Sequence, residues 1–122
     1  MPTLFLYGTS LPGQPEHRWI LGLVMHPATV RGSLWRSARN RPALQPETTG
    51  KPIHGVLVEV DDARLAVLDL VETAGQELLR RAPVRAALNM RSVEAQAWVL
   101  PADERRPGWR KLTLDSWAGM AR

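Results

Sequence analysis

The sequence predicts an α+β fold: a small mixed β-sheet, closed or strongly curled into a barrel, with short flanking helices. About five short segments have the two-residue period or the residue types of strands, and only two or three have helical spacing. So many short strands in 122 residues would leave several exposed edges, which closing the sheet hides. The length fits a single domain over residues 1–122 that buries about two thirds of its unfolded surface.

The first strand is expected over residues 3–7, where strand-forming side chains alternate until Gly8 interrupts the pattern. A short helix follows over 15–21, beginning with a proline, and a second strand over 28–35. Residues 37–52 are polar and contain several prolines. They predict a long surface loop, and the pattern leaves open whether this loop acts as a lid.

A third strand is expected over 53–60, where one face is more apolar than the other. The clearest helix begins after Asp61 or Asp62, either of which can cap its N-terminus, and ends at or just before Gly75. Leu65 and Leu68 lie on one side of this helix and predict its buried face.

The remaining sequence predicts a hairpin of two strands, 81–90 and 93–100, with its turn at 89–92. Residues 114–117 are expected to form a short terminal helix. No internal repeat or linker is found in the chain.

The amino-acid composition excludes several kinds of functional site. Cysteine is absent, which removes disulfides, thiol nucleophiles and thiolate metal sites and agrees with a reducing, cytoplasmic location. The N-terminus has no basic region, and no window approaches the roughly 18 apolar residues of a membrane helix. His17, His26 and His54 lack metal-ligand spacing. We therefore expect neither a metal nor another cofactor.

The chain is basic, with 16 Lys and Arg against 12 Asp and Glu and a net charge of +4. These residues are spread along the sequence, which favours a solvated basic face over a nucleic-acid surface. Trp35, beside Arg31 and Arg36, is the one place where stacking on a nucleic acid is conceivable.

A glycine-containing loop and an acidic helix end together suggest a small-molecule site. The loop Tyr7–Gly13 follows the first strand, and the helix pattern ends in the segment Leu68–Glu72. The backbone N–H groups of the loop can form a concave anion-binding nest, for which Gly8 and Gly13 permit the necessary backbone conformations. The four N–H donors belong to Gly8, Thr9, Ser10 and Leu11.

These motifs occur within an ordered set of residues that spans nearly the whole chain. The set comprises Leu4–Thr9 with Pro12 and Gly13, His17, Gly32, Arg41–Leu44, Gly55 before Leu57–Val60, Leu68-Asp69-x-x-Glu72, Arg81 with Val84, and Trp117. In this respect the chain resembles the gamma-glutamylcyclotransferase-like proteins, a family with AIG2-like and gamma-glutamylamine cyclotransferase branches. The resemblance implies a compact β-barrel with a substrate cavity at its mouth and a small γ-glutamyl compound as substrate.

The resemblance also implies a catalytic role for Glu72, which occupies the family's LDxxE position. The expected substrate-binding residues are Tyr7, Gly8, Thr9, Ser10, Leu11 and Arg41. The chain departs from the family pattern where Ser10 replaces leucine, Thr73 replaces glycine, and Leu78 or Leu79 and Arg41 replace tyrosines. These departures leave a second interpretation open, a noncatalytic binding domain for a small anionic metabolite.

The expected reaction needs little from the protein. The α-amine of a γ-glutamyl amine or peptide attacks its own γ-carbonyl, closes a five-membered ring and releases 5-oxoproline. Such intramolecular attack has effective molarities of roughly 10⁵ to 10⁸ M when aligned. One carboxylate can accept the proton and return it to the leaving group. The sequence does not specify the released amine or the oligomeric state.

The proton affinity of that carboxylate is the main energetic problem. An α-ammonium with a pKa near ~8 loses its proton to a glutamate with a pKa near ~4.3 only at a cost of roughly 5 kcal/mol. Desolvation that raises the pKa of Glu72 by about 2 units offsets roughly half of this cost. Asp69, on the same helix, can either add like-charge repulsion or serve as a structural hydrogen-bond partner. A Ser10-His17-Asp69 triad is disfavoured because Ser10 lacks the G-x-S-x-G elbow.

Overall fold

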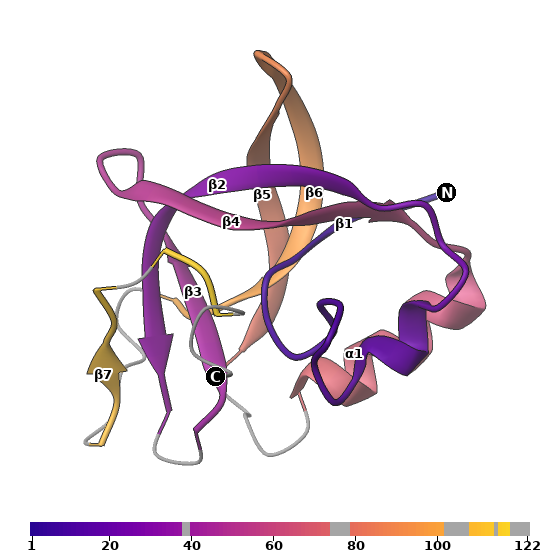
Figure 1. Ribbon diagram of the computed structural model, residues 1–122, viewed down its shortest axis with the longest axis horizontal. Helices are drawn as coiled ribbons and strands as arrows, with labels where there is room; N and C mark the ends of the chain where they lie inside the picture. Colours follow the sequence, from indigo (N-terminus) through magenta and orange to yellow (C-terminus); the bar gives the residue numbers. More distant parts are fainter. Residues whose placement is uncertain (38–39, 74–78, 102–107, 114, 118–122) are drawn as a thin grey trace.

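The computed structural model describes residues 1–37, 40–73, 79–101, 108–113 and 115–117 (Figure 1). Its helices are the 3₁₀ helix η1 (His17–Ile20) and the α-helix α1 (Asp62–Thr73). The strands are β1 (Thr3–Leu6), β2 (His26–Arg36), β3 (Pro42–Pro46), β4 (Lys51–Glu59), β5 (Arg80–Leu88), β6 (Arg91–Val99) and β7 (Arg110–Lys111).

Five of the strands close into a mixed barrel, as the sequence predicts. Strand β4 is antiparallel to β1 and β2, and β3 is antiparallel to β2. Strand β6 then runs parallel to both β3 and β1 and completes the ring. Strand β5 pairs with β6 along its whole length and touches β2 at two positions, and β7 pairs with the end of β2.

The two faces of the barrel wall carry separate apolar clusters, because successive side chains of a strand point to opposite faces. In β1 and just after it, Phe5 and Tyr7 belong to the cluster inside the barrel, whereas Leu4 and Leu6 belong to a second cluster. This second cluster lies between the wall and the helices and includes the fully buried Leu68 of α1. Helices α1 and η1 therefore cover one side of the barrel next to each other (Figure 1).

The prediction of a long surface loop over residues 37–52 is wrong. Residues Pro42–Pro46 form β3, of which only Pro46 is exposed, and Lys51 already belongs to β4. Both prolines occupy the ends of β3, where a missing N–H does not interrupt the strand. The segment between them is part of the barrel wall and is not a lid.

The structure also corrects the end of the chain. The expected helix at 114–117 is not formed within residues 115–117, and Leu114 lies outside the described residues. Trp117 is instead 6% exposed and packs inside the barrel, and the Asp115 carbonyl accepts a hydrogen bond from the His54 N–H at 2.8 Å. Strand β7 was not expected.

Other elements agree with the sequence within a few residues. The predicted hairpin is present, with its turn reduced to Asn89 and Met90, whose φ angles of 49° and 64° fit a two-residue turn of type I′. The short helix is present as the 3₁₀ turn η1, and α1 begins at the expected place. Gly75, expected at its end, lies outside the described residues.

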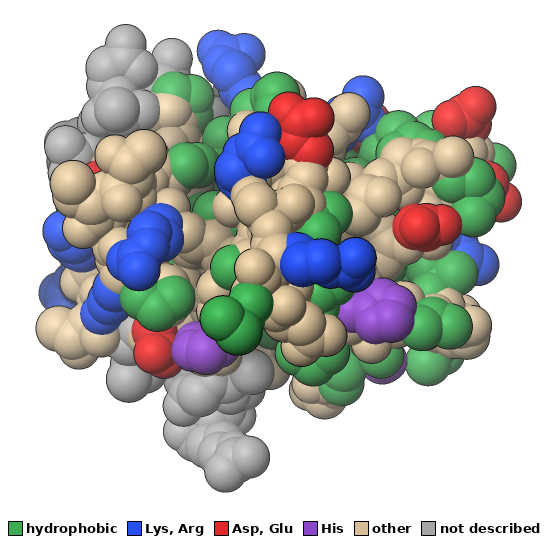
Figure 2. Space-filling model, turned by 90° about the horizontal axis from the view of Figure 1, so that it is seen from above, with side chains coloured by type: hydrophobic (Ala, Val, Ile, Leu, Met, Phe, Trp, Pro, Cys, Tyr) green, Lys and Arg blue, Asp and Glu red, His purple; other side chains and the backbone are tan. Residues whose placement is uncertain are grey.

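The charged side chains are not gathered in one place on the face seen in Figure 2. Lys and Arg side chains lie at several separate positions there, with Asp and Glu side chains among them. In the described part of the chain, neither helix is long and apolar enough to cross a membrane.

Candidate active site

Glu72 lies in the last turn of α1 and points its carboxylate toward the loop that follows β1. The helix is fixed at its start by Asp61, whose Oδ1 accepts a hydrogen bond from the Arg64 N–H at 2.8 Å. It is fixed along its length by Leu68, which is fully buried against the barrel. The Glu72 side chain is thereby held in a partly buried position.

Ser10 connects the loop to Glu72. This serine is fully buried, and its hydroxyl donates a hydrogen bond to Glu72 Oε1 at 2.9 Å. Nδ1 of His17 lies 2.9 Å from the Ser10 carbonyl oxygen, which fixes the loop to η1. The two motifs singled out in the sequence, separated by about sixty residues, are therefore in direct contact.

The loop also presents backbone donors. The Leu11 N–H closes a turn by donating to the Gly8 carbonyl at 3.1 Å. Among the described residues, no backbone hydrogen bond uses the N–H groups of Gly8, Thr9 or Ser10. Three of the four expected donors thus make no backbone hydrogen bond in the described part of the chain.

The two glycines of the loop are required for different reasons. Gly13 has a φ of +83°, as expected for a position that permits a left-handed conformation. Gly8 does not have a positive φ. A Cβ atom at Gly8 would lie 2.6 Å from Cγ of Pro42, so the close approach of β3 is what excludes a side chain there.

Tyr7 supports the loop from inside the barrel. Its hydroxyl donates to the Trp98 carbonyl at 2.5 Å and accepts a hydrogen bond from the Leu44 N–H at 2.9 Å, so it joins β6 to β3 where these strands meet. Burial raises the pKa of Tyr7 above its usual range, the hydrogen bond from Leu44 opposes this, and the nearby Glu72 carboxylate adds to it. The hydroxyl is therefore used within the protein.

Arg41 enters the site from the residue before β3 and is paired with Glu16. Its Nη2 lies 3.1 and 3.3 Å from the two Glu16 carboxylate oxygens and 3.4 Å from the Val71 carbonyl oxygen. Glu16 also accepts a hydrogen bond from the Thr9 hydroxyl. The Nε atom of Arg41 is buried and has no hydrogen-bond partner.

This environment gives Glu72 an unusual proton affinity. Burial raises the pKa of Glu72 from 4.5 to about 7. The Ser10 hydrogen bond lowers it, the Glu16 carboxylate raises it and Arg41 lowers it, in decreasing order of effect. A carboxyl group with a pKa near 7 can both accept and return a proton at neutral pH.

Asp69, the other acid of the motif, has a different setting. Its Oδ1 accepts a hydrogen bond from Trp98 Nε1 at 2.8 Å, and its Oδ2 accepts one from Arg81 Nη1 at 2.5 Å. Of its two expected roles, the structural one is confirmed. The like charge that raises the pKa of Glu72 belongs to Glu16 and not to Asp69, whose carboxylate faces Arg81.

Two alternative groupings of these residues, a catalytic triad and a metal site, were disfavoured by the sequence. The Ser10 hydroxyl, the His17 ring and the Asp69 carboxylate each bond to a different partner, so no triad is formed. Within the described ranges, no group of three or more His, Cys, Asp or Glu residues is placed to hold a metal ion.

The sequence reasoning missed Glu16. It lies next to η1 and meets Arg41, 25 residues away in sequence, only because β3 passes beside the loop. No local pattern in the sequence indicates that Glu16 belongs to the site.

The structure also places two of the departures from the family pattern. Leu79 is buried in the apolar cluster that includes Leu68 of α1, and the Thr73 hydroxyl donates to the Asp69 carbonyl at 2.5 Å. Leu78 lies outside the described residues.

The fold and the site together define a class of small β-barrel proteins with a carboxylate facing a loop of free backbone donors. The family comparison places the chain within one such family: residues 4–119 match gamma-glutamyl cyclotransferase, AIG2-like, and the chain belongs to it. None of the curated proteins with which the chain was compared matched it.

Solved structures show the same fold at low sequence identity. An AIG2-like protein from Mus musculus has a TM-score of 0.72 and 22% identity, with 95% of this chain and 87% of that one covered. A uropathogenic E. coli-specific protein, c4763, has a TM-score of 0.76 and 18% identity, with coverage of 98% and 94%. YkqA from Bacillus subtilis has a TM-score of 0.74 and 18% identity over 97% of this chain, which spans only 40% of YkqA.

Proposed function

We propose that the protein releases 5-oxoproline from a γ-glutamyl amine or peptide, with Glu72 as general base and then general acid. One observation carries this proposal. A partly buried carboxyl group with a pKa of about 7 lies in hydrogen-bond contact, at 2.9 Å, with a loop whose backbone donors are free. Membership of the gamma-glutamyl cyclotransferase, AIG2-like family supports cyclotransferase chemistry in general.

The proton transfers balance with a single carboxylate. Glu72 takes a proton from the α-ammonium, and the free amine attacks the γ-carbonyl carbon. Glu72 then gives that proton to the leaving nitrogen as its bond to carbon breaks. The second amine proton, lost on ring closure, passes to the regenerated carboxylate and from there to the released amine, which departs as an ammonium ion. With the pKa of Glu72 near 7, the first transfer from an ammonium of pKa near ~8 costs only about 1.4 kcal/mol.

The loop residues hold the glutamyl end in this proposal. The free N–H groups of Gly8, Thr9 and Ser10 donate to the α-carboxylate, and Leu11 closes the turn that orients them. Tyr7 contributes by fastening the strand that carries the loop. The substrate is then placed with its α-amine toward Glu72, the orientation that ring closure requires.

Arg41 is proposed to favour a leaving group that carries an acidic function. Its guanidinium is only partly used by Glu16, and the buried Nε has no partner. A substrate carboxylate can form a charge-assisted hydrogen bond with such a group. Arg41→Ala should then reduce turnover of acidic substrates more than turnover of neutral ones. Equal losses would discard this part of the proposal.

The test of the function is a panel of γ-glutamyl amines and dipeptides, acidic and neutral, with 5-oxoproline release as the readout. We expect release from at least one of them and its loss in Glu72→Gln. Silence across the whole panel, with binding of a γ-glutamyl compound or 5-oxoproline retained, would instead support a noncatalytic binding domain for a small anionic metabolite. The absence of cysteine leads us to propose a cytoplasmic location. The protein would there meet small γ-glutamyl compounds and other anionic metabolites.

A further inference from the structure

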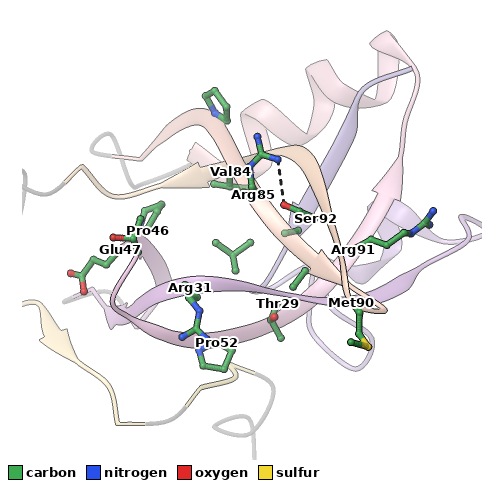
Figure 3. A pocket seen from close by; sticks show the side chains of 15 residues that line it. Thr29, Arg31, Pro46, Glu47, Pro52, Val84, Arg85, Met90, Arg91 and Ser92 are labelled. Atoms are coloured by element: carbon green, nitrogen blue, oxygen red, sulfur yellow. Dashed lines mark hydrogen bonds between the residues drawn. The ribbon is translucent and has the colours of Figure 1, made fainter.

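A cavity of about 670 Å³ opens where β2 and β5 separate, and Figure 3 shows the side chains that line it. None of its lining residues belongs to α1 or to the loop Tyr7–Gly13. It is bordered by the β5–β6 hairpin and the β3–β4 turn, whereas α1 lies at the lower right in Figure 1. Its size is that of small-molecule sites, which are typically about 300 to 1,000 Å³.

The cavity arises from the way the strands diverge. Strands β2 and β5 are in register only at Thr29 with Ala87 and at Val30 with Ala86. Beyond these pairs β2 continues beside β3 and β7, whereas β5 continues beside β6. The opening therefore reaches from the surface to side chains that face the inside of the barrel.

The floor of the cavity is apolar. Val30, Val84 and Ala86 line it and also belong to the apolar cluster inside the barrel. Prolines from three segments, Pro46, Pro52 and Pro83, border it. A ligand with an apolar body that covers this floor removes more apolar surface from water than a polar ligand of equal size.

The rim of the cavity is positively charged. Arg31, Arg85 and Arg91 line it against one carboxylate, that of Glu47. Arg31 Nη1 donates only to a neutral group, the Gly50 carbonyl, at 2.9 Å. Arg85 Nη1 donates to the Ser92 hydroxyl at 3.3 Å, which is the dashed line in Figure 3.

Arg85 has one long ion-pair contact in the part of the chain that the structure describes. Glu94 lies 3.8 Å from Arg85 Nη2, and both side chains are largely exposed. Arg85 and Arg31 come from the two strands that diverge, so they flank the opening on its two sides (Figure 3). Each keeps guanidinium N–H groups that are not used by another side chain.

We infer that this cavity binds a monocarboxylate with an apolar body, such as a medium-chain or arylalkyl carboxylate. The apolar body lies on the floor formed by Val30, Val84 and Ala86. The carboxylate lies at the rim, where it pairs with the guanidinium group of Arg31 or with that of Arg85, on the opposite side of the opening (Figure 3). This site is separate from Glu72 and does not depend on the proposed reaction.

Isothermal titration calorimetry of the full chain with decanoate tests the inference, with decanol and decyltrimethylammonium as matched probes below their micelle-forming concentrations. We expect decanoate to bind with one site per chain, decanol to bind about tenfold or more weakly, and the cation not to bind. The double variant Arg31→Gln with Arg85→Gln should weaken decanoate binding about tenfold or more, the scale of one lost charge-assisted hydrogen bond. Glu47→Gln should tighten it.

Two further variants separate this site from nonspecific binding. Ala87→Trp fills the cavity from an exposed position of β5 and should abolish decanoate binding while the thermal unfolding curve stays cooperative. Arg64→Gln removes the same charge from α1, away from the cavity, and should leave binding unchanged. The inference is overturned if decanol binds as tightly as decanoate, if Arg64→Gln weakens binding as much as the double variant of Arg31 and Arg85 does, or if folded Ala87→Trp still binds decanoate.

Discussion

Two carboxylates on helix α1, those of Asp69 and Glu72, have very different hydrogen-bond partners. Asp69 has both of its oxygens engaged, by the Trp98 indole at 2.8 Å and by the Arg81 guanidinium at 2.5 Å. Glu72, one turn further along α1, accepts a single hydrogen bond within the described ranges, from the neutral Ser10 hydroxyl at 2.9 Å. The first side chain fastens the helix to β5 and β6, and the second faces the loop.

This difference in partners indicates which of the two acids can accept and return a proton. A carboxylate bonded to a guanidinium and an indole N–H has few free lone pairs left for a substrate proton. A carboxylate that is mostly removed from water and meets one neutral donor keeps a high proton affinity, and the pKa of Glu72 is about 7. Sequence alone places both acids in one motif, and their partners assign the roles.

The largest expected effect is on turnover. Glu72→Gln should lower 5-oxoproline release by about 10²- to 10⁴-fold, because a lost general acid-base group costs about that much. Asp69→Asn is the matched control, since it removes a carboxylate from the same helix but keeps an acceptor for Trp98, and it should keep most of the activity. Full activity in Glu72→Gln would end the catalytic assignment.

Glu72→Gln, which should lower turnover, should at the same time raise the stability of the folded protein at pH 8. The folded-state pKa of about 7 lies above the ordinary value of 4.5, so between these values the native state binds more protons than the unfolded state. The free energy of unfolding therefore falls as pH rises from about 5 to 8. Glu72→Gln lacks this penalty and should be more stable than the original protein at pH 8 by about 1 to 3 kcal/mol.

Urea unfolding at pH 5 and pH 8 measures this difference. At pH 5 the original side chain is already protonated in the folded state, so the gain from Glu72→Gln should be much smaller there. A gain of equal size at both pH values, or a loss at pH 8, would show that ionisation of Glu72 does not strain the fold.

A smaller loss of stability is expected at Asp69. Asp69→Ala leaves the Trp98 Nε1–H, on an almost fully buried ring, without its acceptor. Such an unsatisfied donor costs about 1 to 3 kcal/mol, whereas Asp69→Asn retains the acceptor and should cost less. Chemical denaturation of the two variants makes the comparison. Equal costs would assign the role of Asp69 to its ion pair with Arg81 rather than to Trp98.

The smallest effects are shifts in the pH profile. The Ser10 hydrogen bond lowers the pKa of Glu72 and the Glu16 carboxylate raises it. Ser10→Ala should therefore move the acidic limb of kcat/KM to higher pH, and Glu16→Gln should move it to lower pH. Rate measurements from pH 5 to 9 on one γ-glutamyl substrate compare both variants. Shifts in the same direction would contradict the proposed electrostatics.

The barrel could be predicted from the sequence because its longer elements have clear periods. The alternating residues of β1, the Asp61 cap and the Leu65–Leu68 face of α1 are local signals, and the structure bears them out. Strand β3 was missed because Pro42 and Pro46 bound a segment of only five residues, PALQP. Trp117 was assigned to a helix because nothing local shows that its ring packs inside the barrel.

The candidate site could be predicted in outline but not in its electrostatics. The loop and Glu72 were found from their sequence motifs and from the family resemblance, and the structure brings them into contact. The pairing of Arg41 with Glu16 follows from the path of β3 past the loop, which no spacing in the sequence encodes. Burial in the assembled fold raises the pKa of Glu72, and long-range contacts of this kind adjust it, so the size of the pKa shift could not be derived from the motif.

The most direct test of the central claim is a carbon-13 NMR titration of the Glu72 side-chain carboxyl group in the folded protein, assigned by its disappearance in Glu72→Gln. We predict a midpoint at a pKa of about 7, because burial, and to a smaller extent the Glu16 carboxylate, disfavours the charged form. A midpoint at the ordinary value of 4.5 would show that this carboxylate is well solvated and would contradict its role as the proton acceptor.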